Sequence, residues 1–90
     1  MTPADRPFLP RGVRLHHDRV RGVPVLLGPE TALMLDQVGQ AVLVEVDGTR
    51  DIATISAALA ERYAAPVEMI EADVIEFLDD MAARRLVEAT

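Results

Sequence analysis

The sequence predicts an α+β fold of the winged helix-turn-helix-like type, in which a three-stranded antiparallel sheet is followed by three helices. Two observations lead to this prediction. Apolar and polar residues alternate in the first third of the chain, which is typical of half-buried strands. After Asp36 the apolar residues recur at intervals of three and four, which is typical of amphipathic helices.

The chain is long enough for one core and no more, because it has 90 residues. Residues 1–12 are expected to form an extended N-terminal arm, since Pro3, Pro7 and Pro10 remove backbone donors and disfavour helix. Residues 13–90 are then a single winged-helix-like domain. Its core must be aliphatic, because the chain has only three aromatic residues.

Two alternating runs, 13–16 and 23–27, predict a hairpin. Pro24 lies inside the second run and cannot donate to a ladder, so the start of that strand is expected at a sheet edge. Residues 32–35 follow the break at Gly28-Pro29 and predict a third short strand.

Asp36 and Asp51 are expected to cap the first and second helices, and Pro66 to lie in the first turn of the third. Asp47-Gly48 is expected to stop the first helix, although alternating valines leave a strand open there. The residues expected to face the core are Val38, Ala41, Val42 and Val46 in the first helix, Ile52, Ile55, Leu59 and Tyr63 in the second, and Val67, Ile70, Val74, Phe77, Leu78 and Met81 in the third.

Composition excludes several kinds of chemistry. The chain has no Cys and no Lys, so disulfides, thiolate metal sites and lysine Schiff bases are ruled out. Residues 31–90 hold four arginines against twelve carboxylates, which argues against a nucleic-acid partner. No apolar run reaches the length of about 18 residues that a membrane span needs, so no membrane partner and a cytoplasmic location are expected.

The residues that could carry catalysis or bind a metal have simpler explanations. His16 and His17 are adjacent on a strand, so one is expected to face the core and one the solvent, and they cannot chelate one metal. Ser56 and Thr54 have no partner base. The third-helix carboxylates are neighbours on a solvated face; they are Glu68, Glu71, Asp73, Glu76, Asp79 and Asp80. No enzyme activity, metal or cofactor is therefore expected.

Two kinds of binding remain open. Strands followed by three helices also occur in winged-helix DNA-binding domains, but six carboxylates on the last helix would repel a duplex. An edge strand at residues 32–35 could instead pair with an extended peptide. The same edge could be covered by the N-terminal arm or by another protein surface, such as a second copy of the chain.

An ordered series of short motifs adds a family to this interpretation. The motifs are Pro10-Arg11-Gly12-Val13-Arg14-Leu15, Val25-Leu26-Leu27, Pro29-Glu30, Leu33-x-Leu35-Asp36, Asp47-Gly48-Thr49, Leu59-Ala60-x-x-Tyr63 and Asp73-Val74-x-x-Phe77-Leu78. In this order and spacing they resemble the pyrroloquinoline quinone biosynthesis protein D (PqqD) family over residues 7–88. Two positions depart from the family pattern: Asp36 replaces a frequent Asn, and Arg85 replaces a frequent Gly.

The resemblance implies a peptide chaperone. It would bind the precursor peptide PqqA and present it to the radical SAM enzyme PqqE, which joins a Glu and a Tyr side chain of the peptide. In related recognition elements the peptide adds a strand beside the third strand, in a groove bounded by the third helix. The contacts implied here are Ala32, Leu33, Met34 and Leu35 on the strand and Asp73 and Glu76 on the helix.

Overall fold

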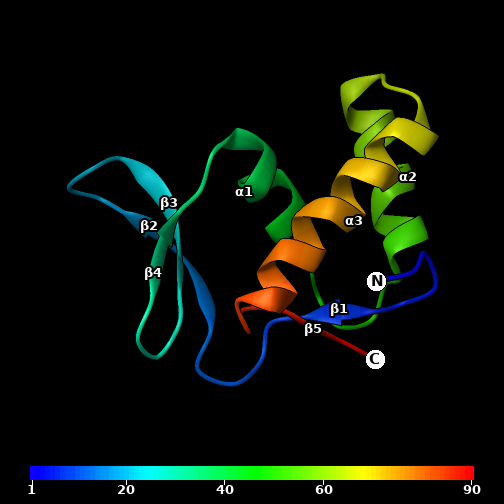
Figure 1. Cartoon of the computed structure of the whole chain (residues 1–90). Helices are drawn as coiled ribbons and strands as arrows, with labels where there is room; N and C mark the ends of the chain where they lie inside the picture. The colour runs from blue at the N-terminus through cyan, green and yellow to red at the C-terminus, as the bar shows by residue number, and fades with distance from the viewer.

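The computed structural model describes all 90 residues, with a small sheet on one side of three helices (Figure 1). The main sheet has the antiparallel strand order β2-β3-β4. Its strands are β2 (Arg14–Asp18), β3 (Val23–Leu27) and β4 (Ala32–Met34), and the helices are α1 (Gln37–Leu43), α2 (Ile52–Tyr63) and α3 (Val67–Ala83). The predicted α+β, winged-helix-like architecture is confirmed.

The β2–β3 hairpin closes through Asp18. Its carboxylate accepts hydrogen bonds from the amides of Val20 and Arg21 at 2.9 and 3.2 Å, and its carbonyl accepts one from Gly22 at 2.7 Å. Gly22 has a φ of 69°, which glycine adopts without the steric cost that a Cβ brings. The hairpin therefore forms from local contacts and extends away from the helices (Figure 1).

The sequence suggested that the strand containing Pro24 starts at a sheet edge. This prediction is wrong, because β3 is the central strand of the sheet. Pro24 pairs with His17 on one side, and its carbonyl accepts the amide of Leu35 at 2.9 Å on the other. Since β4 ends at Met34, the proline ring falls where the β3–β4 ladder is already ending. The missing backbone donor therefore costs little stability at that position.

The two predicted aspartate caps are confirmed. Asp36 accepts from the amide of Gly39 at 2.7 Å, and Asp51 accepts from the amide of Thr54 at 2.8 Å. The first helix is shorter than expected, since α1 ends at Leu43 and Val46 lies beyond it. Pro66 occupies the cap position of α3 rather than its first turn.

The core is aliphatic, as composition required. Residues from α2 and α3 pack against each other and against the inner face of the sheet. The buried cluster comprises Leu26, Leu35, Ala41, Val42, Leu43, Ile52, Ile55, Leu59, Val74, Leu78, Met81, Leu86 and Val87. No helix combines the length and apolar character needed to cross a membrane.

A second, two-stranded sheet joins the two ends of the chain. β1 (Pro7–Phe8) pairs with β5 (Glu88–Ala89) in antiparallel register. Upstream of β1, the carbonyls of Pro3 and Asp5 accept the amides of Ala53 and Ile52, both at 2.9 Å. The residues expected to form an extended arm thus lie against the start of α2, where they satisfy two amides of its first turn.

Candidate functional site

The outer edge of β4 is the first component of the site. β4 has a neighbouring strand on one side only. Leu35 donates to the carbonyl of Pro24, and Thr31 accepts from the amide of Gly28 at 2.7 Å, so these residues direct their main-chain groups toward β3. Direction alternates along an antiparallel strand. Ala32 and Met34 therefore direct their amides and carbonyls away from the sheet.

The side chains of this segment also alternate. Ala32 and Met34 are exposed, with 60% of Met34 accessible to solvent, whereas Leu33 is half-buried and Leu35 is buried in the core. The structure thus divides the four strand residues that the resemblance implied as contacts. Ala32 and Met34 offer free main-chain groups, while Leu33 and Leu35 hold the strand against the protein.

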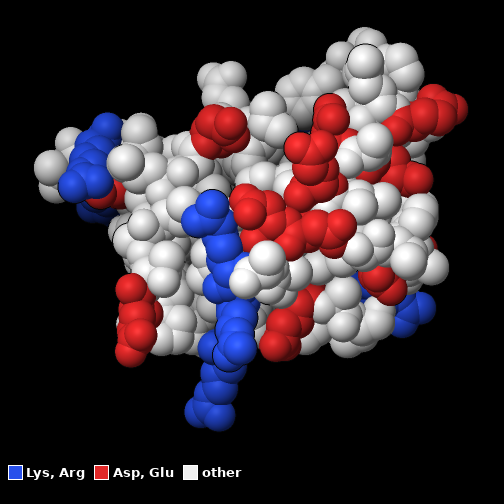
Figure 2. Space-filling view, viewed as in Figure 1, with Lys and Arg blue, Asp and Glu red and all other residues white.

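The acidic face of α3 is the second component. Asp73 and Glu76 are exposed neighbours one turn apart, and they line an open surface depression with Phe77 and Asp80, which we call the acidic hollow. Figure 2 shows carboxylates gathered on this side of the molecule. The structure therefore brings Asp73 and Glu76 together on one surface.

Gly39 fixes how closely α3 approaches the segment that follows β4. A Cβ on Gly39 would lie only 3.1 Å from Cε1 of the Phe77 ring and 3.3 Å from Oδ1 of Asp36. The ring of Phe77 therefore packs directly against the first turn of α1. Because Asp36 follows β4 by only two residues, this contact sets α3 beside the end of the open strand.

A second depression, which we call the apolar hollow, lies between the three helices. It is lined by Gln37, Val38, Ala41, Val42, Leu59, Tyr63, Ile70, Asp73 and Val74. Val38 and Tyr63 were expected to face the core, yet 62% and 53% of their surfaces are exposed. The helical spacing gave their common face correctly but could not show that the face opens to solvent.

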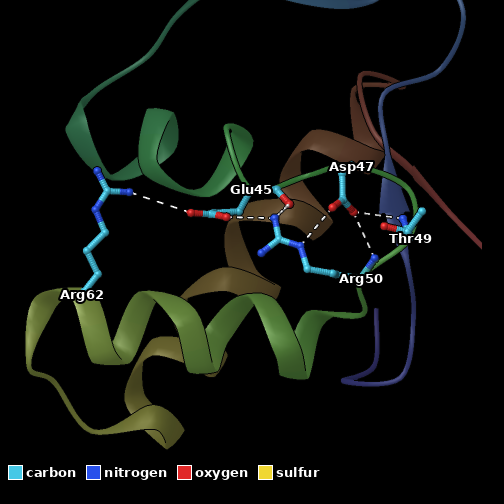
Figure 3. A network of polar contacts seen from close by, with 5 residues as sticks. All are labelled: Glu45, Asp47, Thr49, Arg50 and Arg62. Carbon is cyan, nitrogen blue, oxygen red and sulfur yellow. Dashed lines mark hydrogen bonds and ion pairs between the residues drawn. The ribbon is translucent and has the colours of Figure 1, made fainter.

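A polar network organises the loop between α1 and α2 and reaches α2 through Arg62 (Figure 3). Arg50 donates to the Glu45 carboxylate and carbonyl, both at 2.8 Å, and to the Asp47 carboxylate at 3.0 Å. Arg62 of α2 lies 3.9 Å from the other Glu45 oxygen. Amide donors from Arg50 and Thr49 hold the pKa of Asp47 well below its usual range. The carboxylates of Glu45 and Asp47 raise the pKa of Arg50.

The other candidate residues show no arrangement for catalysis or metal binding. Ser56 is fully buried, and its Oγ has no hydrogen-bond partner, so no base activates it. His16 and His17 are both exposed, which corrects the expectation that one faces the core. The reason is that His17 lies at the outer end of the hairpin, beyond the helices. No group of three or more His, Asp or Glu side chains is close enough to hold a metal ion.

The fold and the open strand define this chain as a small winged-helix-like domain of the kind found in peptide recognition elements. Residues 25–87 match the profile of the family described as "Coenzyme PQQ synthesis protein D (PqqD)". The chain belongs to the PqqD family. It is 46% identical over 80 residues to the "PqqA binding protein" of Rhizobium meliloti, covering 89% of this chain and 82% of that one.

A longer relative contains the same domain as one part. The chain is 44% identical over 85 residues to the "Bifunctional coenzyme PQQ synthesis protein C/D" of Methylorubrum extorquens. That match covers 94% of this chain but 23% of the relative.

Solved structures share the fold. One is the solution structure of the PqqD portion of Methylobacterium extorquens PqqCD, which is described as a functional, stand-alone recognition element for ribosomally synthesized and modified peptides. It matches with a TM-score of 0.84 and 42% sequence identity, and the match covers 97% of this chain and 93% of that one. The crystal structure of PqqD from Xanthomonas campestris matches with a TM-score of 0.61 and 42% identity over 87% of each chain. TbiB1, solved in complex with the TbiA(beta) leader peptide, matches in fold alone, with a TM-score of 0.76 and 24% identity over 90% of this chain and 94% of that one.

Proposed function

We propose that this chain binds the precursor peptide PqqA as an added strand on β4 and presents it to the radical SAM enzyme PqqE. The observation that carries the proposal is the open edge of β4, with the main-chain groups of Ala32 and Met34 directed outward beside α3. Its family membership supports the choice of peptide, because several relatives are named PqqA binding proteins. The proposal gives this chain no catalytic step and places its action in the cytoplasm, where ribosomal peptides are made.

A preformed strand edge suits a flexible ligand. Ordering a disordered peptide costs conformational entropy, and the outward amides and carbonyls offset that cost without rearrangement of the protein. Leu33 and Leu35 keep the edge rigid, since their side chains pack against the core. In this proposal Asp73 and Glu76 form the opposite wall of the groove and favour a peptide segment that carries basic side chains.

Amide shifts in isotope-labelled protein, titrated with synthetic PqqA, test the binding step. We expect saturable shifts at residues 31–36 and along the exposed face of α3, and small shifts in the β2–β3 turn. Shifts confined to other surfaces would contradict strand addition on β4. No shifts at millimolar peptide would contradict direct binding by this chain.

Met34→Pro provides a sharper test, because the amide of Met34 is directed away from β3. Proline at such an edge position removes no bond of the existing ladder but does remove the donor offered to the peptide. We expect Met34→Pro to remain folded. In calorimetry it should bind PqqA at least about tenfold more weakly, because one hydrogen bond is lost and the proline ring fits the peptide less well.

Met34→Ala is the matched control, since it shortens the side chain and keeps the amide. It should bind more tightly than Met34→Pro. Equal affinity of the two variants would show that the main chain of Met34 is not used.

Presentation to the enzyme needs a separate measurement. Holding one part of PqqA raises the effective concentration of the remainder at the enzyme. We expect PqqE to form the Glu–Tyr cross-link in PqqA faster when this chain is present, and Met34→Pro to lose that stimulation. An unchanged rate with and without this chain would remove the presenting role while leaving peptide binding intact.

A further inference from the structure

We propose that the apolar hollow between α1, α2 and α3 receives one large apolar side chain of the bound peptide. This residue lies just N-terminal to the segment that pairs with β4. The inference rests on the proposed function, because it extends the same peptide beyond the strand edge.

The hollow has the size and lining for such a side chain. Its volume is about 240 Å³, and seven of its nine lining residues are hydrophobic. Val38 and Tyr63 stand at its opening with more than half of their surfaces exposed. Covering these side chains removes apolar surface from water, so an occupant gains from both its own burial and theirs.

The hollow is continuous with the proposed peptide groove. Asp73 lines both the apolar hollow and the acidic hollow, where it is joined by Glu76, Phe77 and Asp80. On the other side, Gln37 and Val38 are the first two residues of α1, which begins three residues after Met34. A peptide that leaves the end of β4 along α3 therefore passes over the opening of the apolar hollow.

Strand direction determines which end of the peptide reaches the hollow. All strands of this sheet are antiparallel, and antiparallel pairing is slightly the more stable arrangement. β4 runs toward α1 (Figure 1), so an antiparallel peptide has its N-terminal side there. The occupant therefore precedes the paired segment in the peptide sequence.

The lining also defines the chemistry of the occupant and of its neighbour. The walls are aliphatic apart from Tyr63, Gln37 and Asp73, which suits a leucine, isoleucine or phenylalanine side chain. No arginine lines either hollow, and Asp73 lies where they meet. A basic residue next to the apolar one would therefore find a carboxylate partner.

Val38→Glu tests the hollow, and Val67→Glu is its matched control. Both valines are exposed residues in the first turn of a helix, where a carboxylate complements the helix dipole, but only Val38 lines the hollow. With synthetic PqqA in calorimetry, we expect Val38→Glu to weaken binding about 10- to 100-fold and Val67→Glu by less than about twofold. Shifts at residues 31–36 should persist in both variants at saturating peptide.

The outcomes separate this inference from the proposed function. If Val38→Glu binds like the wild type, or if both variants weaken equally, the apolar hollow is not the site. If the wild type itself does not bind PqqA, the proposed function and this inference both fail. Should Val38→Glu prove unfolded by circular dichroism, Val38→Thr takes its place with Val67→Thr as control, and equal affinities of these two variants would overturn the inference.

A peptide series completes the test. Each large apolar residue of PqqA on the N-terminal side of the paired segment is replaced in turn by serine. One replacement should weaken binding to the wild type yet have little further effect on Val38→Glu, because both changes remove the same contact. Additive losses at every position would contradict a shared contact.

Discussion

One alanine and one arginine adopt a backbone conformation that normally belongs to glycine. Ala64 has a φ of 52° and Arg85 a φ of 61°, and each ends a helix. After each residue, the next amide donates back across the last turn, from Ala65 to Ala60 and from Leu86 to Met81. This is the Schellman type of helix ending, in which a left-handed residue with a Cβ costs about 1 kcal/mol or more.

Ala64→Gly should therefore stabilise the protein by about 0.5–1 kcal/mol, because glycine adopts the left-handed region without that cost. Ala57→Gly is the matched control: Ala57 is exposed within α2, where glycine should destabilise by a similar amount. Urea unfolding followed by circular dichroism measures both. Changes of the same sign would contradict the conformational explanation.

Neither left-handed conformation was predicted from the sequence, although Arg85 was noted as a departure from the family pattern. Arg85 occupies a position where the resembling family often has Gly, and the structure shows why glycine suits it. Alanine is a good helix former, and nothing around Ala64 signals a left-handed residue. A single sequence shows a strained position only when another residue type is expected there.

At the level of elements, the sequence predicted best where a local contact defines a boundary. Asp36 and Asp51 start helices through bonds to residues three positions away, so both starts could be inferred. The β1–β5 pair could not be inferred, because each strand has two residues and its partner lies about 80 positions away. Such short strands have no periodicity of their own.

The candidate site was predictable in part for the same reason. The sequence offered an edge at residues 32–35 as one possibility, since short connections favour neighbouring strands, and the observed strand order leaves β4 at the edge. The exposure of Val38 and Tyr63 depends on how three helices cross, and spacing along one helix does not contain that information. The apolar hollow was therefore missed.

The loop between α1 and α2, together with the cap of α2, should make the stability of the protein sensitive to acid. Amide hydrogen bonds hold the pKa of Asp47 and of Asp51 below their usual values. Such carboxylates contribute stability above the unfolded pKa of about 3.9, and the contribution is lost as pH falls through the lower folded values. The melting temperature should therefore fall between about pH 4 and pH 2.

Asp51→Asn isolates one part of this effect. Asparagine caps a helix almost as well as aspartate but does not titrate, so the variant should lose less melting temperature over the same acid range. Thermal unfolding followed by circular dichroism at several pH values measures the slope. Parallel curves for the wild type and Asp51→Asn would show that Asp51 does not contribute to acid unfolding.

Across the whole molecule, charge is divided between the two ends of the sequence. Residues 1–30 have a small excess of arginine, whereas the helical part is strongly acidic. Figure 2 shows many carboxylates of this face gathered in its central and right-hand part, with a column of basic side chains directly beside them. In the proposed binding mode, the carboxylates of the acidic hollow would attract a peptide segment with basic side chains.

Asp73→Lys should weaken PqqA binding by about three- to tenfold at low salt, because reversal replaces attraction with repulsion at an exposed site. Glu61→Lys is the control, since it changes net charge equally from an exposed position on α2 that lines neither hollow. The difference between the variants should shrink as salt is added, because salt screens exposed charges. Equal losses for both variants would indicate long-range attraction without a local partner.

The pairing of β1 with β5 has a consequence for how this domain can be joined to other proteins. It fastens the two end segments of the chain to each other below the helices, apart from β4 (Figure 1). A protein linked after β5 would thus be joined at a place apart from the strand edge, whereas the N-terminal amine lies against Asp79 of α3. The C/D protein of Methylorubrum extorquens contains the matching domain within a longer chain. A chain continued after β5 would therefore leave the proposed peptide-binding edge unchanged.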